Sequence, residues 1–387
     1  MKRSNFKFTN SVPIDFGYER VTELGEDLKE INRTNPLIVT DSDIFESGVI
    51  SPILNSLENH DLSYETYTDV KPNPKDVDVE EGTDFARSEN CDSIIAVGGG
   101  SSIDTGKAIA VLTPNKNDIH SYWRSEYGTY KTCKNDPLPI FTVPTTVGTG
   151  SEVTSGFVVT DTKSNKKRVA GTKSFAPQKA ILDPSLLETL PTNVIASTGM
   201  DSLTQAIESY ISPGANPITD AIAVRAVELI ANNIRPAVAG TDTKALGEMQ
   251  VATSMGAIAM TNAGLGLVHG MSHPVSAHHH TPHGLTNGVL LPYVLEYNLI
   301  GATSKYANMA ELMGVNTSEM SDREAAASFV DEVRQLQRDV GIPTNLKEIG
   351  VTKESLSTLA GEAVETGIPN PRDYSTEEVL EIFEKAY

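Results

Sequence analysis

The chain has 387 residues, of which 51 are acidic and 31 are basic, so its formal net charge is −20. This balance argues against nucleic acid and anionic membrane surfaces as partners, because both bind through clustered Lys and Arg. Hydrophobic residues make up 39% of the chain and charged residues 21%, a composition typical of an ordered globular protein. At roughly 100–200 residues per domain, the length predicts two domains.

The acidic excess has two explanations that the sequence leaves open: an ordinary acidic protein, or one adapted to high salt, where a charged surface stays hydrated. The two cysteines, Cys91 and Cys133, form no CxxC pair, which excludes a disulfide framework and a thiolate zinc site. The basic first residues lead into polar residues and Pro13, and apolar stretches are interrupted well before about 18 residues. We therefore expect no signal peptide, no membrane span and a cytoplasmic location.

In the first half, apolar runs alternate with helical segments. Residues 36–41, 92–97 and 138–143 have the composition of buried strands, and residues 43–59 and 77–90 have helical character. Alternating strands and helices predict a parallel, doubly wound sheet, whose ligands bind at the carboxyl ends of the strands.

After residue 184 helical periodicity dominates. Helices are predicted at residues 192–212, 217–239, 244–263, 322–340 and 376–387. We therefore expect an α/β domain over residues 1–185 and an all-helical domain over residues 186–387.

Two polar segments directly follow strands of the predicted sheet. Residues 98–104, GGGSSID, open a helix, and glycines beside a helix N-terminus allow a pyrophosphate to approach backbone N–H groups. The alternative is a plain strand-to-helix turn in which Asp104 caps the helix. Residues 143–152, VPTTVGTGSE, offer several hydroxyl donors after the third strand, although a surface turn has the same composition.

Six of the eight histidines lie between positions 269 and 283. His269 and His273 are four residues apart, so a helix places both on one face, and Pro282 before His283 indicates the start of another helix. Imidazoles that meet in a helical domain can form a divalent-metal site, usually completed by a carboxylate. Asp201 is a candidate, with Gln205 on the same helical face. His278, His279 and His280 are interpreted as a solvated run, whereas His269 lies among apolar residues and needs a partner.

Together these segments resemble the iron-containing, group III alcohol dehydrogenase family over nearly the whole chain. The matching segments are FG (16–17), VTD (39–41), PNP (72–74), GGGSSID (98–104), PTTVGT (144–149), TGMD (198–201), GLGLVHGMSHP (264–274), PHG (282–284) and NPR (370–372). The resemblance implies an N-terminal dinucleotide-binding domain and a helical metal-binding domain, the architecture shared with dehydroquinate synthase. It also implies a cleft where the nicotinamide meets the metal, and a homodimer or larger homo-oligomer.

Carried over position by position, the resemblance implies a set of cofactor-binding residues: Asp41, Asn73, Gly99, Gly100, Ser101, Asp104, Thr145, Thr146 and Thr149. Asp41 would approach the adenosine ribose. A carboxylate there favours NAD over NADP because it repels a 2′-phosphate, although a nearby basic residue would reverse this preference.

The metal ligands of the family fall on Asp201, Gln205, His269 and His283, and the second position departs from the family, which has histidine there. Because an amide oxygen is a harder and weaker donor than imidazole, this set favours Mn²⁺ or Fe²⁺ over Zn²⁺ and predicts easier metal loss. A vacant site, as in metal-independent relatives, is the alternative.

The expected reaction is reversible hydride transfer between a nicotinamide and a primary alcohol or its aldehyde. The ligands Asp201, His269 and His283 would hold a Lewis-acid metal, and His273 matches a family histidine that could move the proton. A polyol or hydroxy-acid dehydrogenase is the main alternative. A lyase resembling dehydroquinate synthase would need a Lys/Arg cluster that the metal-site segments lack, and the cofactor motifs argue against a non-catalytic metal-binding protein.

Overall fold

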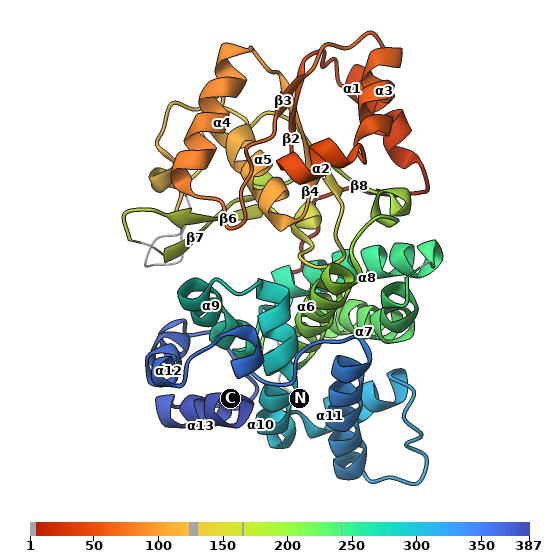
Figure 1. The fold of residues 1–387 in the computed structure, drawn as a ribbon, viewed down its shortest axis with the longest axis vertical. Coiled ribbons are helices and arrows are strands. Elements are labelled where there is room, and N and C mark those ends of the chain that lie inside the picture. The colour runs from red at the N-terminus through yellow and green to blue at the C-terminus, as the bar shows by residue number, and fades with distance from the viewer. Residues whose placement is uncertain (1–4, 124–130, 165, 241) are drawn as a thin grey trace. The chain divides into compact units, whose positions relative to one another are not determined.

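The computed structural model describes residues 5–123, 131–164, 166–240 and 242–387 (Figure 1). The chain divides into two compact units. The sheet unit comprises Asn10–Thr146 and Gly150–Thr189, and the helical unit comprises Leu190–Tyr387 with the segment up to Thr9 and with Val147–Thr149. The sequence predicts a domain boundary near residue 185. In the structure the chain passes from the sheet unit to the helical unit between Thr189 and Leu190.

The sheet unit is built on a six-stranded sheet in which every described pairing is parallel. The strand order is β1-β8-β5-β4-β2-β3. The strands are β1 (Ile14–Phe16), β2 (Pro36–Val39), β3 (Glu65–Tyr67), β4 (Ser93–Gly98), β5 (Ile140–Pro144) and β8 (Lys179–Leu182). The predicted parallel, doubly wound sheet is therefore confirmed, and β4 and β5 lie side by side at its centre.

Successive residues of the central strands point to opposite faces of the sheet and pack into two separate hydrophobic cores. Both faces are therefore buried, which is why the strand sequences are apolar throughout. Ile94 and Ala96 of β4 belong to one core, and Ile95 and Val97 belong to the other. The first core is covered by α4 (Asp76–Ser88) and α5 (Gly100–Leu112), the second by α1 (Leu24–Glu30) and α3 (Ser51–Asn59) (Figure 1). A continuous apolar run thus reports burial on both faces of the sheet.

Two local details differ from the sequence analysis. The helix expected over residues 43–59 is broken into α2 (Ser42–Ser47) and α3, because Gly48 adopts a left-handed φ of 77° that ends α2. The antiparallel hairpin of β6 (Gly156–Asp161) and β7 (Lys166–Gly171) was not predicted. β6 alternates buried and more exposed residues and has a short apolar run of only three residues, and β7 is mostly exposed and begins with Lys and Arg, so neither resembles the fully buried central strands.

The helical unit contains no β-strand among its described residues, as predicted. Its helices are α6 (Thr192–Ile211), α7 (Pro217–Val238), α8 (Thr243–Ala263), α9 (Leu267–His279), α10 (His283–Leu312), α11 (Asp322–Asp339), α12 (Leu356–Glu365) and α13 (Thr376–Ala386). The length of α10 was not anticipated, because Pro292 lies inside it and Ala302 has non-helical angles. Within the described ranges no single helix is long and apolar enough to cross a membrane; only α8 and α9 together, bent by 104°, pass that test by length and composition.

Candidate metal centre and cofactor loop

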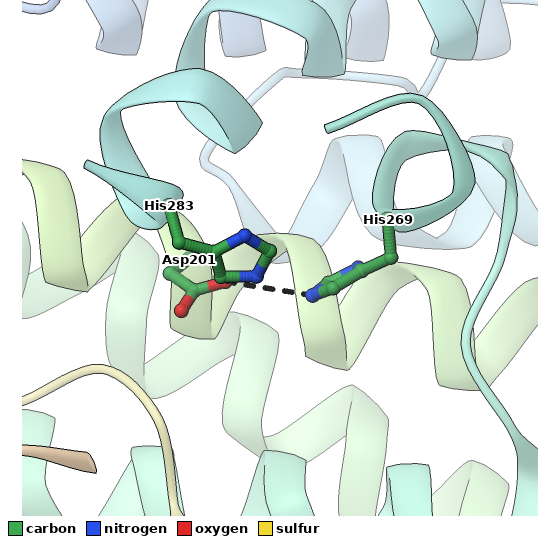
Figure 2. A group of neighbouring side chains, drawn as sticks. All are labelled: Asp201, His269 and His283. Carbon is green, nitrogen blue, oxygen red and sulfur yellow. Dashed lines mark ion pairs between the residues drawn. The ribbon is translucent and has the colours of Figure 1, made fainter. Parts of the chain in front are cut away.

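Three helices of the helical unit bring Asp201, His269 and His283 together (Figure 2). Asp201 lies in the middle of α6, His269 in the first turn of α9, and His283 is the first residue of α10. The Asp201 Oδ1 atom is 3.5 Å from His269 Nε2 and 3.9 Å from His283 Nε2. The structure therefore brings together three of the four residues expected to bind the metal.

The spacing of these atoms fits a divalent metal. Two ligands that each lie about 2.1 Å from a tetrahedral ion are about 3.4 Å apart, which is close to the 3.5 Å between Asp201 and His269 and somewhat shorter than the 3.9 Å between Asp201 and His283. The ligand atoms of the three side chains all lie within 4.8 Å of one another. One carboxylate and two imidazoles form a donor set that suits zinc, iron or manganese.

Burial differs among the three ligands. Asp201 and His269 are 3% and 2% exposed, whereas the His283 side chain is 29% exposed. Burial raises the pKa of the Asp201 carboxyl, but the charge of His283 and the hydrogen bond to His269 outweigh it, so the net shift is downward. Burial lowers the pKa of His269, but Glu208 and Asp201 raise it to about 9. His283 is therefore the most exposed of the three candidate ligands.

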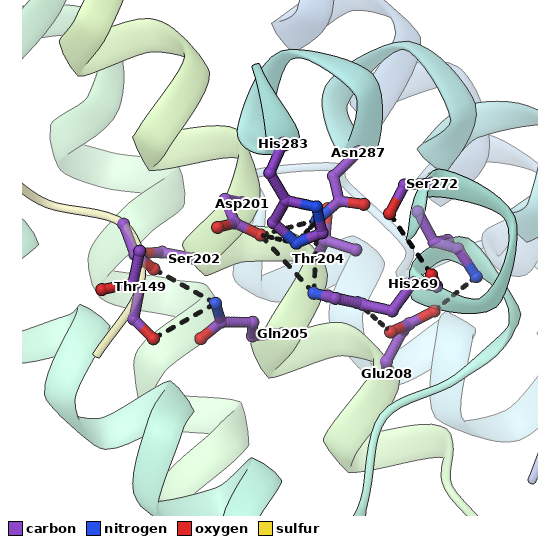
Figure 3. A network of polar contacts seen from close by, with 12 residues as sticks. Thr149, Asp201, Ser202, Thr204, Gln205, Glu208, His269, Ser272, His283 and Asn287 are labelled. Atoms are coloured by element: carbon purple, nitrogen blue, oxygen red, sulfur yellow. Dashed lines mark hydrogen bonds and ion pairs between the residues drawn. The ribbon is translucent and has the colours of Figure 1, made fainter. Parts of the chain in front are cut away.

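Asn287 contacts all three ligand atoms and was missed by the sequence analysis. It lies on α10 one turn after His283, and its Nδ2 donates to Asp201 Oδ1 at 2.7 Å. The same nitrogen is 3.2 Å from His269 Nε2 and 3.2 Å from His283 Nε2 (Figure 3). Asn287 is fully buried, and its Oδ1 has no hydrogen-bond partner among the described residues. The spacing of four from His283 was the only clue in the sequence.

Gln205 lies on α6 one turn after Asp201, on the face that was predicted (Figure 3). Its Nε2 donates to the backbone oxygens of Gly148 at 3.2 Å and Thr149 at 3.5 Å. These bonds fix which end of the amide is the donor. The Oε1 atom is buried without a hydrogen-bond partner within the described part of the chain. A buried acceptor left in this state is what a metal or a bound reactant would satisfy.

Glu208 supplies the partner that buried His269 required. Its Oε2 accepts a hydrogen bond from His269 Nδ1 at 2.6 Å, and the carboxylate is 2% exposed. Its position three residues after Gln205 on the same helix was the signal available in the sequence.

The other histidines of this segment divide as predicted except His279, which was interpreted as solvated but is half-buried and contacts Ser355 Oγ at 2.9 Å. The His273 ring lies 6.0 Å from the His269 ring and 5.3 Å from the His283 ring, between centroids, and His273 is half-buried. His278 and His280 are exposed, His279 is half-buried, and His278 pairs with Glu362. His273 therefore belongs to the cluster, whereas His278 and His280 form a solvated run.

In the sheet unit, the glycine-rich segment forms the turn from β4 into α5. Gly98 has a φ of 142°, and a Cβ placed there would lie 2.5 Å from Ser102 Oγ, so only glycine fits. Gly99 is the N-cap residue of α5, with Gly100 and Ser101 in the first turn. The first N–H groups of a helix have no intrahelical acceptor, which makes this turn a suitable place for a phosphate.

Asp104 holds the loop beside this turn. Its Oδ1 accepts from Ser151 Oγ and its Oδ2 from the Val158 N–H, both at 2.9 Å. Because Asp104 lies inside α5 and Gly99 caps the helix, the alternative that Asp104 is the cap is wrong. Lys107, whose pKa burial lowers to about 8, donates to Gly156 O at 2.9 Å.

The other predicted cofactor residues lie at strand ends of this unit, except Thr149, which belongs to the helical unit. The Thr145 N–H donates to Gly98 O at 3.0 Å, and a Cβ on Gly99 would lie 3.4 Å from Thr146. Asp41 follows β2 and caps α2 through Ile44 N. Asn73, after β3, is exposed with a φ of 53°.

A parallel sheet with a glycine turn and a helical unit with a candidate Asp, His, His metal site are features typical of nucleotide-dependent metalloenzymes. The chain belongs to the iron-containing alcohol dehydrogenase family. The family model for iron-containing alcohol dehydrogenase matches residues 13–184, and the model for the C-terminal part of the family matches residues 195–387. The resemblance inferred from the sequence motifs is thereby confirmed, and the protein is an oxidoreductase that acts on CH–OH groups.

Curated relatives match over almost the full chain. The 1,3-propanediol dehydrogenase of Citrobacter freundii is 39% identical, with 96% of both chains covered. The lactaldehyde reductase of Escherichia coli K12 is also 39% identical, covering 96% of this chain and 97% of the relative. The NAD-dependent methanol dehydrogenase of Bacillus methanolicus is 36% identical, with the same coverage. The crystal structure of a 1,3-propanediol oxidoreductase superposes with a TM-score of 0.95 at 37% identity, covering 99% of this chain and 100% of that one.

Proposed function

We propose that this protein catalyses reversible, NAD-linked hydride transfer between a short primary alcohol and its aldehyde, with a divalent metal held by the helical unit. The observation that carries the proposal is the convergence of Asp201 Oδ1, His269 Nε2 and His283 Nε2 in a member of the alcohol dehydrogenase family. Membership of the alcohol dehydrogenase family argues against the two other hypotheses, a lyase resembling dehydroquinate synthase and a non-catalytic metal-binding protein.

The proposed metal ligands are Asp201, His269, His283 and Gln205. When bound, a divalent metal polarises the carbonyl of an aldehyde and lowers the pKa of an alcohol. Asp201 supplies negative charge, and Asn287 fixes its carboxylate through the 2.7 Å hydrogen bond. Gln205 is the predicted fourth donor: its Oε1 has no hydrogen-bond partner among the described residues, while its Nε2 is bound to the backbone of Gly148. With two oxygen and two nitrogen donors, the site favours Mn²⁺ or Fe²⁺ over Zn²⁺.

His273 is the proposed catalytic residue for proton movement. Its ring is stacked on the His283 ring at an interplanar angle of 29°, and it is half-buried. A histidine in this position can hold the proton of the reacting hydroxyl and pass it to solvent.

NAD is the proposed cofactor, bound through Gly99, Gly100, Ser101, Thr145 and Thr146, with Asn73, Asp104 and Thr149 completing the predicted set. The cofactor supplies or accepts the hydride. Asp41 follows β2 and Asp69 follows β3, and the two residues form an isolated β-bridge, so two carboxylate residues lie side by side at these strand ends. Their charge disfavours the 2′-phosphate of NADP and supports NAD.

The relatives bear on the substrate class. Two of them are named for 1,3-propanediol and for lactaldehyde, which both carry a second oxygen close to the reacting carbon. Short diols and hydroxyaldehydes are therefore the second candidate substrates, beside simple alcohols.

A homodimer is proposed through the edge of the sheet. Strand β1 pairs only with β8 among the described strands, so its other edge offers unpaired backbone groups. Ile14, Phe16 and Tyr18 are 37%, 48% and 52% exposed along this segment. A second copy that pairs with β1 about a two-fold axis would cover both the backbone groups and these side chains.

The test is the rate of nicotinamide oxidation by chelator-stripped protein to which Mn²⁺, Fe²⁺ or Zn²⁺ is returned. Short aldehydes, hydroxyaldehydes, NADH and NADPH are compared at low and high salt. We expect metal-dependent turnover, fastest with Mn²⁺ or Fe²⁺ and NADH, and a rise at high salt if the acidic surface is a salt adaptation. Equal rates without metal would contradict the proposal.

A further inference from the structure

Glu208 makes a set of contacts at the metal centre to which neither the sequence nor the family match assigns a role. It lies on α6 seven residues after Asp201, so two helical turns separate the residues and both can face the same side. Its carboxylate is 2% exposed and accepts three hydrogen bonds (Figure 3). They come from His269 Nδ1 at 2.6 Å, from the Val268 N–H at 2.7 Å and from the Gly266 N–H at 2.9 Å.

These bonds determine which nitrogen of His269 is available to a metal. Two backbone N–H groups face the carboxylate, so its oxygens act as acceptors and the third contact requires His269 Nδ1 to carry a hydrogen. The other ring nitrogen, Nε2, lies 3.5 Å from Asp201 Oδ1 and is the nitrogen that a metal would bind, in place of any hydrogen it carries without the metal. A carboxylate that holds the far nitrogen of a histidine also increases the basicity of the nitrogen that binds metal.

The same carboxylate holds the helix that carries His269. Gly266 is the N-cap residue of α9 and has no side chain to cap it, so Glu208 satisfies two N–H groups at the helix start. The packing is tight, because a Cβ on Gly266 would lie 2.9 Å from Glu208 Oε1. One side chain therefore sets both the position of the α9 N-terminus and the ring orientation of its first histidine.

We propose that Glu208 is a positioning residue of the metal centre, which keeps His269 in the tautomer and orientation that bind the metal through Nε2. The inference rests on the proposed function, since it needs a metal at Asp201, His269 and His283. Glu208 is assigned no contact with the metal or the substrate.

The first experiment measures metal affinity of the full-length protein by competition with a chelator. In Glu208→Gln, one carboxylate oxygen becomes an NH₂ group that faces a backbone N–H in either orientation of the amide, so the side chain no longer fits this position and offers the ring at most a neutral acceptor. We expect Mn²⁺ to bind about 10–100-fold more weakly, the range seen when such a partner of a metal ligand is removed. Glu208→Asp keeps the charge with a shorter reach and should recover part of this loss.

A matched control separates this role from simple structural support. Asp183 is also fully buried and accepts hydrogen bonds from the Glu19, Val21 and Ser185 N–H groups, but it lies in the sheet unit. Asp183→Asn should lower stability without a change in Mn²⁺ affinity. Gly266→Ala tests the same contact from the other side, because it displaces Glu208 without removing its charge, and it should weaken Mn²⁺ binding.

A second measurement needs no variant and therefore does not depend on folding of the mutants. Nitrogen NMR of the wild-type protein, labelled at histidine and loaded with Zn²⁺, should show His269 with a hydrogen on Nδ1 and the metal on Nε2. Metal on Nδ1, or Glu208→Gln that binds Mn²⁺ as tightly as wild type, would overturn this inference alone. Wild-type protein that binds no metal would overturn the proposed function as well, so the two failures are distinguishable.

Discussion

Replacing Gln205 by histidine tests how the amide shapes the metal centre. The variant Gln205→His gives the site a third imidazole in place of an oxygen donor. We expect tighter metal binding overall and a shift of preference from Mn²⁺ or Fe²⁺ toward Zn²⁺, because imidazole is the softer and stronger donor.

The contacts of Gln205 set the size of the effect. The substitution removes the donor to Gly148 O, a hydrogen bond worth about 0.5–1.5 kcal/mol. Gly148 O keeps the hydroxyl of Ser202 at 3.1 Å, so this carbonyl retains a donor, and the longer contact to Thr149 O at 3.5 Å is lost as well. The substitution also removes a buried oxygen without a partner, a group that costs about 1–3 kcal/mol. Because these effects oppose each other, the metal-free variant should unfold within a few degrees of wild type.

The difference should appear once metal is added. A tenfold gain in Zn²⁺ affinity corresponds to about 1.4 kcal/mol, and we expect at least that gain. Chelator competition gives the dissociation constants for Zn²⁺ and Mn²⁺, and thermal unfolding with and without metal gives an independent value. Gln337→His is the matched control, since Gln337 is buried and also donates to two backbone oxygens, those of Gly288 and Pro343.

Two results would refute the reasoning. If wild type and Gln205→His retain every metal equally through chelation and dialysis, Gln205 is not a ligand. If Gln337→His shifts the Zn²⁺ to Mn²⁺ ratio as much as Gln205→His, the shift reflects general packing and not a new ligand.

Further predictions concern the rest of the molecule. Gly98→Ala should weaken NADH binding at least about tenfold, since its Cβ would lie 2.5 Å from Ser102 Oγ; fluorescence titration measures this, and unchanged affinity would argue against the turn as the cofactor site. Burial lowers the pKa of His120 but its hydrogen bond to Asp118 raises it above the unfolded value of 6.5 overall. This stabilisation is complete below pH 6.5 and is lost as the pH rises through the folded pKa, so the melting-temperature advantage over His120→Gln should shrink as the pH is raised above 6.5; a constant difference would show that the ring charge is irrelevant. Phe16→Glu at the β1 edge should convert a dimer to a monomer in light scattering, and a wild-type monomer would exclude the edge interface.

Much of the fold was predictable because local patterns carried it. The apolar runs ending at residues 97 and 143 are buried on both faces of the sheet, so their composition alone marks parallel strands. The hairpin of β6 and β7 was missed because β6 has only a short apolar run and β7 is mostly exposed and partly basic. The start of α10 at His283 was predicted, but its length was not, because Pro292 inside the helix is a residue that usually ends one.

The sequence by itself determined the family through its motifs and the sheet through its apolar runs. It also determined the ligand candidates, because a spacing of four along a helix places Asp201 and Gln205, and likewise His269 and His273, on one face. Only the tertiary structure decided which side chains meet. Glu208 lies far from His269 along the chain, and Asn287 lies far from Asp201. The hydrogen bond within each pair joins two helices, and no local sequence pattern encodes how those helices pack. The contacts of Gln205 are also decided by the tertiary structure. Its amide nitrogen donates to the backbone oxygens of residues 148 and 149, and its amide oxygen has no partner among the described residues.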